Sequence, residues 1–413
     1  MFKFKKLTLQ KRGGDLIKTA FASLALLMLL PDTTYACSFN CSNKTYTKKH
    51  SFGPIINVEV SSYVVSKEVN RDPSLKIWEP KPAKDKTSSC LKTQYWDDAD
   101  MKFDKTAQGY HWPNLPNGAS RFASENLLML NHIVGAQFSS TQDGKHSNIK
   151  EKKVVQTLKQ RLLKAANDNA FTKPKWKEEG GSSPSFVTAV TVKSNSFTVS
   201  ALNELGALSE QEFKQIDGWT LELIKNMAKT NRGEGWLSPD HMVAVFSAHI
   251  LYGAASKNRE LFDIGKTEFE AYLKKRSTSG IGDQIRNDNE AMHHAVIAAE
   301  ILELNGIPAY DFKLKDGTFD DAVSRHASNV LDLGYKEVKT QGDPKDKARI
   351  IMRKSGYGTH IAWIPIYLSR QYDSPNAGPV KQLDQIVRSR DPNPYFGLQI
   401  GLHTDCYFGS GLQ

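Results

Sequence analysis

The chain has 413 residues, of which 39% are hydrophobic and 24% are charged. This composition is typical of a globular protein and excludes an intrinsically disordered chain. The length suffices for one large domain or two ordinary ones. No apolar stretch beyond the N-terminal segment reaches the length of a membrane span, so we expect no stable membrane insertion of the mature chain.

The first 36 residues have the composition of a secretory signal. Basic residues precede an apolar run over Thr19–Leu30, and Thr34-Tyr35-Ala36 supplies a cleavage site of the A-x-A kind. A lipoprotein with an acylated Cys37 is the alternative. We therefore expect residues 1–36 to be removed and the mature chain to be periplasmic or secreted.

Four cysteines remain after cleavage, and export to an oxidising compartment favours two disulfides among them. They are Cys37, Cys41, Cys90 and Cys406. Three pairings are possible, and the sequence leaves them open. A zinc site is the rival interpretation, but the chain has no C-x-x-C pair and no histidine cluster beside these cysteines.

The formal net charge of +10 falls to +6 once the six basic and two acidic residues of the signal are removed. A net positive exported protein favours encounter with polyanions. Outside the cytoplasm this indicates acidic glycans or a membrane surface rather than nucleic acid. Ordinary solubility charge is equally compatible with the same number.

Residues 37–120 are rich in Pro, Ser, Lys and Trp and show little helical periodicity, which predicts a loop-rich segment that wraps a core. Helical patterns dominate from residue 121 to the end. The first two helices are predicted over Ser124–Val134 and Ile149–Ala166, where apolar residues recur at helical spacing.

Lys173–Pro184 is predicted to be a linker because Pro and Gly interrupt it. The next segment, Phe186–Val199, alternates Val, Thr and Ser, and we expect it to hold one or two short strands.

Six further helices are predicted after this segment, separated by short turns. They run over Ser209–Lys229, His241–Ala255, Leu261–Lys275, Asp283–Leu304, Asp320–Leu331 and Ala348–Tyr372. Short turns between consecutive helices indicate antiparallel helix hairpins. The sequence therefore predicts an all-α fold of stacked hairpins, curved into a toroid or solenoid with a concave face, over residues 121–413.

Trp236, Asp240 and His241 lie at the start of one predicted helix, in the stretch Gly-Trp-Leu-Ser-Pro-Asp-His from residue 235. A helix N-terminus presents free N–H groups and partial positive charge, which suits a carboxylate ligand. The alternative is that Asp240 caps the helix and His241 is a surface residue.

A polar ridge is predicted on the helix that begins near residue 283. At about 100° per residue, Arg286 and His293 fall within about 20° of each other, and Asn289 lies on the same stripe. Such a ridge either lines a cleft or is simply a solvent-exposed face of the helix. His294 points about 100° away from His293, toward the apolar side of the helix. The alternative interpretation of His294 is a core histidine that is bonded to a backbone carbonyl.

Aromatic residues near the C-terminal helices are candidates for binding sugar rings. Gly356 and Gly358 flank Tyr357, which allows an unusual backbone and an exposed ring. Tyr357, Trp363 and Trp236 could therefore form subsites. Trp363 has a second interpretation, as a core aromatic of the last helices.

The stretch Asp240–Phe246, followed by Asn258–Asp263 and by Glu268-Phe269, resembles the alginate (poly-mannuronate) lyases of polysaccharide lyase family 5. The resemblance lies mainly within residues 235–310. The family opens this helix with Asn-Asn-His, where the present chain has Pro239-Asp240-His241.

The family's next helix carries an arginine and, two turns later, a catalytic tyrosine. Arg286 falls near the place of that arginine, and His293 or His294 takes the place of the tyrosine. This departure puts the identity of the base in doubt.

The resemblance implies an α/α toroid, an incomplete barrel of helix hairpins, that needs no metal or other cofactor. It implies β-elimination on an acidic polysaccharide such as alginate, in which cationic and amide groups neutralise the uronate carboxylate and a base removes the adjacent proton. The residues expected to be catalytic are His241, Arg286, His293, His294 and Tyr357, and those expected to bind substrate are Trp236, Asp240, Asn289 and Trp363.

Two other functions fit the same sequence. A glycoside hydrolase would need two carboxylates, which Glu234, Asp240, Asp288 and Glu290 could supply. A non-catalytic module that binds an exported polyanion would need no base, and the missing tyrosine favours that function slightly.

Overall fold

The computed structural model describes residues 69–77, 122–123, 126–127, 129–130, 153–172, 184–234, 239–281, 285–332 and 361–390. Within these residues every regular element is an α-helix or a short 3₁₀ turn, and β-pairing is confined to isolated bridges. The prediction of an all-α fold is confirmed for this part of the chain.

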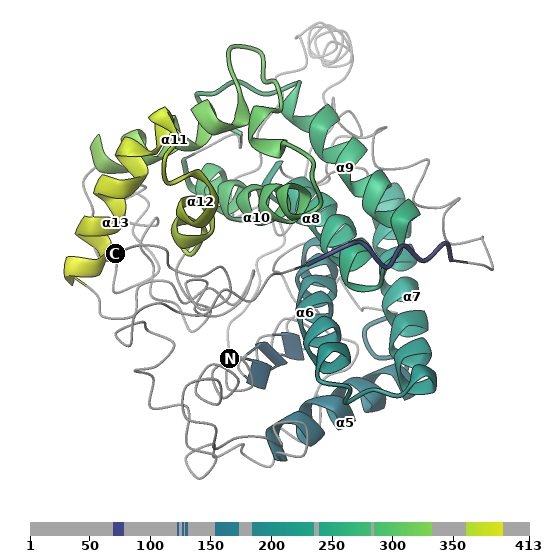
Figure 1. The fold of residues 1–413 in the computed structure, drawn as a ribbon. Helices are drawn as coiled ribbons and strands as arrows, with labels where there is room; N and C mark the ends of the chain where they lie inside the picture. Colours follow the sequence, from purple (N-terminus) through teal and green to yellow (C-terminus); the bar gives the residue numbers. More distant parts are fainter. Residues whose placement is uncertain are drawn as a thin grey trace, which may run out of the picture. The chain divides into compact units, whose positions relative to one another are not determined.

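Between residues 184 and 273 the helices follow one another with short connections (Figure 1). The elements in chain order are α5 (Lys153–Asn167), α6 (Pro184–Glu204), α7 (Glu210–Glu234), α8 (Pro239–Ala255), α9 (Arg259–Leu273), α10 (Ile285–Leu304), η4 (Ala309–Asp311), α11 (Phe319–Asp332), α12 (Trp363–Gln371), η6 (Pro375–Ala377) and α13 (Gly378–Arg390). Six of the predicted helices correspond to α5 and α7–α11, with ends displaced by a few residues. The sequence did not predict α13.

The strand prediction for Phe186–Val199 is wrong, because these residues belong to α6. Its β-branched side chains disfavour a helix locally, yet nearly the whole element is buried. The hydroxyls are bonded inside the helix, as when Thr191 donates to the Val187 carbonyl at 3.0 Å and Thr198 to the Ser194 carbonyl at 2.8 Å. Such back-bonding satisfies polar groups that burial would otherwise leave unpaired.

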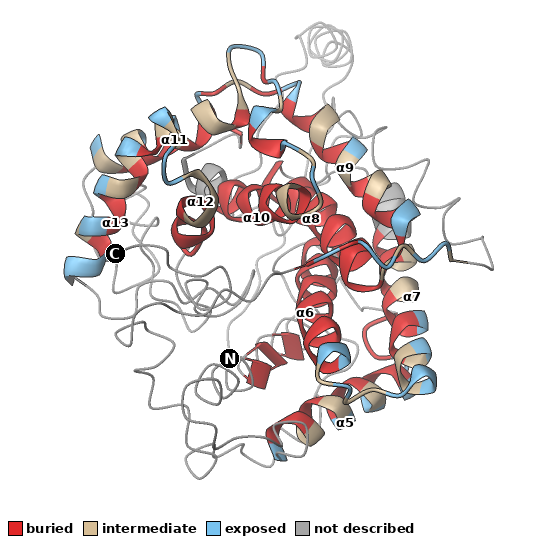
Figure 2. Ribbon diagram, viewed as in Figure 1, coloured by how far each residue is buried: buried red, intermediate tan, exposed pale blue. Residues whose placement is uncertain are grey.

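The described helices form two rows (Figure 1). In the inner row α6 contacts α8, α8 contacts α10, and α10 contacts α12. The outer helices pack on them: α7 on α6, α9 on α8, and α13 on α11 and α12. Figure 2 shows the inner helices buried almost all round and the outer ones buried on one face. Polar side chains on the inner row are therefore enclosed by neighbouring helices.

Helices α8 and α9 approach closely at two glycines. A Cβ atom on Gly253 would lie 2.5 Å from the Phe262 backbone nitrogen, and one on Gly265 would lie 2.8 Å from the His249 Cβ atom. Asn258 begins the second helix by accepting a hydrogen bond from the Leu261 backbone N–H at 3.1 Å. The hairpin predicted from the short turn is thus a tightly packed pair.

Residues 69–77 lie against the turn between α8 and α9 and the end of α10. The Asp72 backbone N–H donates to the Lys257 carbonyl at 2.7 Å. The Asn305 side chain accepts from the Lys76 backbone N–H and donates to the Lys76 carbonyl, both at 2.7 Å. This part of the loop-rich segment is therefore fixed to the helices by backbone hydrogen bonds.

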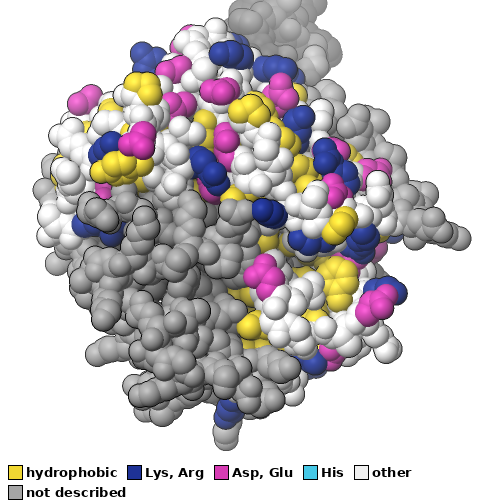
Figure 3. Space-filling view, in the orientation of Figure 1, with side chains coloured by type: hydrophobic (Ala, Val, Ile, Leu, Met, Phe, Trp, Pro, Cys, Tyr) yellow, Lys and Arg dark blue, Asp and Glu magenta, His cyan; other side chains and the backbone are white. Residues whose placement is uncertain are grey.

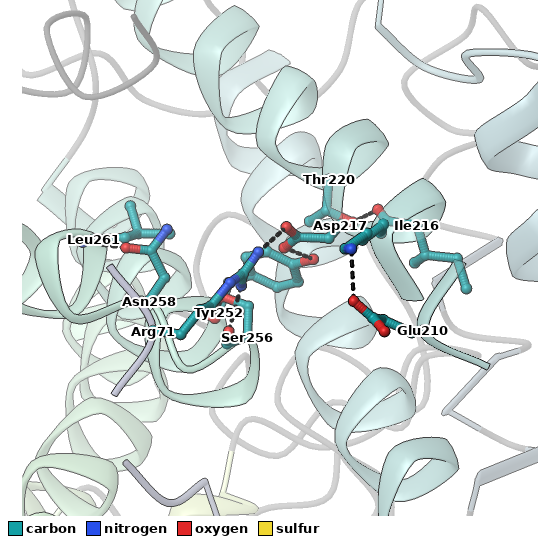
Figure 4. A network of polar contacts seen from close by, with 10 residues as sticks. Arg71, Glu210, Ile216, Asp217, Thr220, Tyr252, Ser256, Asn258 and Leu261 are labelled. Carbon is teal, nitrogen blue, oxygen red and sulfur yellow. Dashed lines mark hydrogen bonds and ion pairs between the residues drawn. The ribbon is translucent and has the colours of Figure 1, made fainter. Parts of the chain in front are cut away.

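A partly buried ion pair also holds this segment (Figure 4). Arg71 donates to the Asp217 carboxylate at 2.6 Å and to the Ser256 carbonyl at 2.5 Å, and the Tyr252 hydroxyl donates to the other Asp217 oxygen at 3.0 Å. Burial and the Asp217 charge raise the pKa of Tyr252 well above its ordinary value, which keeps its hydroxyl a donor. We call Arg71, Asp217, Tyr252 and Ser256 the Arg71 network.

Several predictions fall outside the described residues. They concern the signal over residues 1–36, the four cysteines, and most of the segment 37–120. The chain divides into the units Met1–Cys41 and Ser42–Gln413, and every described residue belongs to the second unit. In that described part, each helix is too short or too polar to cross a bilayer.

Candidate functional site

Three inner helices bring aromatic and imidazole rings together at one place. Phe186, in the first turn of α6, stacks on His241 of α8, with ring centroids 4.5 Å apart and planes inclined by 29°. The same phenylalanine meets His294 of α10 with its centroid 5.8 Å away. His293 and His294 have centroids 5.6 Å apart. Residues separated by more than fifty positions in the chain thus become neighbours.

Lys193 completes this group from α6. Its Nζ atom lies 2.5 Å from Nδ1 of His294, and both side chains are fully buried. Burial lowers the pKa of Lys193 well below its ordinary value, and the Glu290 charge opposes that shift. Glu290 lies one helical turn before His294 and is itself buried. We call Phe186, Lys193, His241, Glu290, His293 and His294 the histidine cluster.

Sequence reasoning missed Lys193, although a signal was present. It is the one charged residue between Pro184 and Asn203. Charged side chains are rarely buried without a functional or ionic partner. On a helix, Phe186 lies two turns before Lys193 on the same face. The strand prediction for this segment hid that relation.

The two sides of the cluster differ in access to water. The His241 side chain keeps 19% of its surface exposed, whereas His293 and His294 are buried at 1% and 0%. Asp240 is buried beside His241, with 3.9 Å between its Oδ2 atom and Nε2 of the imidazole. Among the described residues, the other Asp240 oxygen meets no hydrogen-bond donor. His241 is therefore the member of the cluster that a dissolved molecule could reach.

The ridge predicted on α10 is enclosed at His293, so the alternative of a solvated face does not hold for that residue. Further along the same stripe, the buried Glu300 carboxylate accepts two hydrogen bonds from Arg370 of α12, at 2.8 Å and 3.2 Å. His294 is buried as its alternative interpretation required, but its Nδ1 partner is the Lys193 amine and not a backbone carbonyl.

The substrate-binding role predicted for Trp363 is corrected. Its indole is fully buried in α12, with its ring centroid 5.8 Å from that of His326. A sugar ring stacks only on an aromatic face that it can reach. Trp363 is therefore a core residue, which is the second interpretation that the sequence allowed.

The remaining predicted residues are located only in part. Arg286 and Asn289 belong to the first turns of α10, but their side chains lie outside the described residues. Trp236 and Tyr357 lie outside them entirely. The structure thus places His241, His293 and His294 in one group with Asp240 alongside, and the catalytic and binding roles of all the predicted residues stay predictions.

The described surface carries both signs of charge. On the face in Figure 3, Lys and Arg side chains are interspersed with Asp and Glu. Exposed pairs such as Lys164 with Asp168, at 2.8 Å, contribute little to stability. The preference for polyanions therefore stays a prediction from net charge.

The cluster has the groups needed for proton transfer. An imidazole can act as acid or base, and the phenylalanine supplies an apolar wall. Among the described residues, no set of three or more His, Cys, Asp or Glu side chains has the arrangement of a metal site.

Comparisons with known proteins do not identify the chain. No protein-family model and no curated protein matches it. Its function has to be inferred from the geometry of the histidine cluster and from the local sequence resemblance.

Proposed function

We propose that the chain is an exported polysaccharide lyase that cleaves a uronate-containing polysaccharide, such as alginate, by β-elimination at the histidine cluster. The observation that carries this proposal is the convergence of His241 with His293 and His294. These are the histidines that the family resemblance aligned with the lyase site. The two rows of contacting helices support the α/α toroid that the same resemblance implies.

The reaction requires a base, an acid and positive charge. The proton on C5 of a uronate is weakly acidic, because the adjacent carboxylate is already negative, so neutralising that carboxylate lowers the barrier. In the proposed reaction His241, the accessible imidazole, takes the C5 proton. The C4–C5 double bond forms as the bond from C4 to the glycosidic oxygen breaks, and the leaving oxygen receives a proton. The positive charge that neutralises the carboxylate is expected from Arg286, whose side chain lies outside the described residues.

The test is an assay of the purified mature chain on a panel of polyuronates, followed by the ultraviolet absorbance of the unsaturated product. We expect cleavage with a new double bond, and a loss of about 100-fold or more in kcat/KM for His241→Asn. His326→Asn is the matched control, because His326 is also buried but lies on α11 outside the cluster.

The products separate the proposal from its rivals. New reducing ends without new absorbance would indicate a glycoside hydrolase. Binding of polyuronate without any turnover would indicate a polyanion-binding protein. Full activity of His241→Asn would remove His241 from the reaction.

A further inference from the structure

The contact between Lys193 and His294 joins two bases. The amine nitrogen and the imidazole Nδ1 are 2.5 Å apart in a fully buried setting, so they share a hydrogen bond. One of the two atoms must donate. A lysine amine carries hydrogens in both of its charge states, whereas Nδ1 of an imidazole carries one or none.

We propose that Lys193 is a positioning residue that donates to Nδ1 of His294 and so keeps the imidazole hydrogen on Nε2. His294 then presents an N–H group within the buried part of the cluster, and the role of base in the proposed reaction stays with the accessible His241. The catalytic part of this inference rests on the proposed function, whereas the hydrogen-bond part does not.

The assignment of the donor follows from counting protons in the pair. An ammonium can only donate, which leaves the hydrogen of a neutral imidazole on Nε2. If the shared proton moves to the imidazole, both ring nitrogens carry hydrogen and Nε2 is still a donor. A neutral amine that donates gives the same result. Only a neutral amine that accepts from Nδ1–H would leave Nε2 without its hydrogen.

The surroundings act on the charge of the pair in opposite directions: burial lowers the pKa of Lys193 well below its ordinary value, and the Glu290 carboxylate, on the same helix as His294, opposes that shift. The other titratable groups in the cluster are His293 on α10 and His241 on α8. Phe186 contacts both His241 and His294, so the accessible imidazole and the buried one share an apolar neighbour.

The experiment combines histidine NMR with kinetics on the full mature chain. Ring ¹⁵N shifts are recorded on protein labelled at histidine, and His294 is assigned by its absence from the His294→Asn spectrum. In the wild type we expect His294 to carry hydrogen on Nε2. Lys193→Met removes the donor and should shift the Nδ1 resonance, with kcat falling about 10-fold to 100-fold and KM little changed.

Two further variants separate positioning from packing. Lys193→Gln retains an N–H donor and should restore the wild-type ring shifts and part of kcat. Lys257→Met is the control, because Lys257 is partly buried and donates to the Leu75 carbonyl, but lies outside the cluster. It should leave the His294 shifts and kcat unchanged.

A neutral His294 with its hydrogen on Nδ1 in the wild type would overturn the inference. So would Lys193→Met with unchanged ring shifts, whatever happened to kcat, because a purely structural lysine would give that result. A wild type that cleaves no polyuronate would instead refute the lyase function, while the NMR spectra would still decide which atom donates.

Discussion

The histidine cluster and the Arg71 network both hold polar side chains between packed elements, but they are built differently. The cluster lies between α6, α8 and α10, and the network joins α7, α8 and residues 69–77. In the Arg71 network a carboxylate accepts from a guanidinium and from a hydroxyl (Figure 4). In the histidine cluster an amine meets an imidazole, and two further imidazoles lie close by.

The two groups differ in whether burying their polar side chains is energetically favourable. Opposite charges and satisfied hydrogen bonds offset the cost of burial. An amine next to an imidazole gains no attraction between opposite charges. Burial therefore removes both groups from water without an ion pair to offset the lost hydration. Local rules are broken in this way chiefly at functional sites. We therefore regard the Arg71 network as an anchor for residues 69–77 and the histidine cluster as the candidate site.

Removing the ring of Phe186 should have the largest effect on stability. Phe186→Ala is expected to lower the free energy of unfolding by about 3 to 5 kcal/mol, because the ring is buried between helices α6, α8 and α10. Phe186→Leu, which keeps most of the volume, should cost less than about 1.5 kcal/mol. Urea unfolding measures both. A small effect of the alanine variant would mean that the ring does not hold the cluster together.

His326 shows what burial alone does to a histidine. Burial lowers its pKa from 6.5 to about 4 in the folded chain. The unfolded chain therefore binds this proton more tightly, and the stability of the fold should decrease by up to about 3 kcal/mol as the pH falls from 6.5 toward 4.

His326→Gln cannot titrate, so its loss of stability over that pH range should be smaller than that of the wild type. Urea midpoints at pH 7 and at pH 4.5 test this. Equal losses in the two proteins would show that His326 is not the group responsible.

Breaking the Arg71 network should cost less. Asp217→Ala leaves the buried Tyr252 hydroxyl without its acceptor, whereas Arg71, with 36% of its side chain exposed, can turn to water. We expect a loss of about 2 kcal/mol in the free energy of unfolding, with lyase activity retained.

A surface pair gives the baseline for this measurement. Asp263→Ala breaks the exposed pair with Arg259 and should cost less than about 0.5 kcal/mol. If Asp217→Ala were equally mild, the Arg71 network would not be an anchor.

The smallest expected change in stability is that of Lys193→Met. Replacing a buried amine by an apolar side chain of similar length should leave the free energy of unfolding within about 1 kcal/mol of the wild type, or raise it. Thermal unfolding beside the kinetic assay would show whether activity falls while stability does not. If Lys193→Met lowered the free energy of unfolding by about 2 kcal/mol or more, as expected for Asp217→Ala, the histidine cluster would stabilise the fold as the Arg71 network does.

The sequence by itself determined where most of the described helices lie. The periodicity of apolar residues marked α5 and α7–α11, and their ends were visible in local chemistry. Ser209 and Glu212 form a reciprocal capping box at the start of α7, and Gly306 adopts a positive φ after the end of α10. These signals are readable because each acts within a few residues of the chain.

Tertiary structure alone decided α6 and the site. The Val-Thr-Ser pattern of residues 186–199 is compatible with a strand, and only enclosure by neighbouring helices makes a helix that is buried on every side favourable. Lys193 and His294 are 101 positions apart, so no local pattern could show that they touch. Helical periodicity depends on a residue's neighbours in the chain, whereas the contacts of a buried polar group depend on how the helices are stacked.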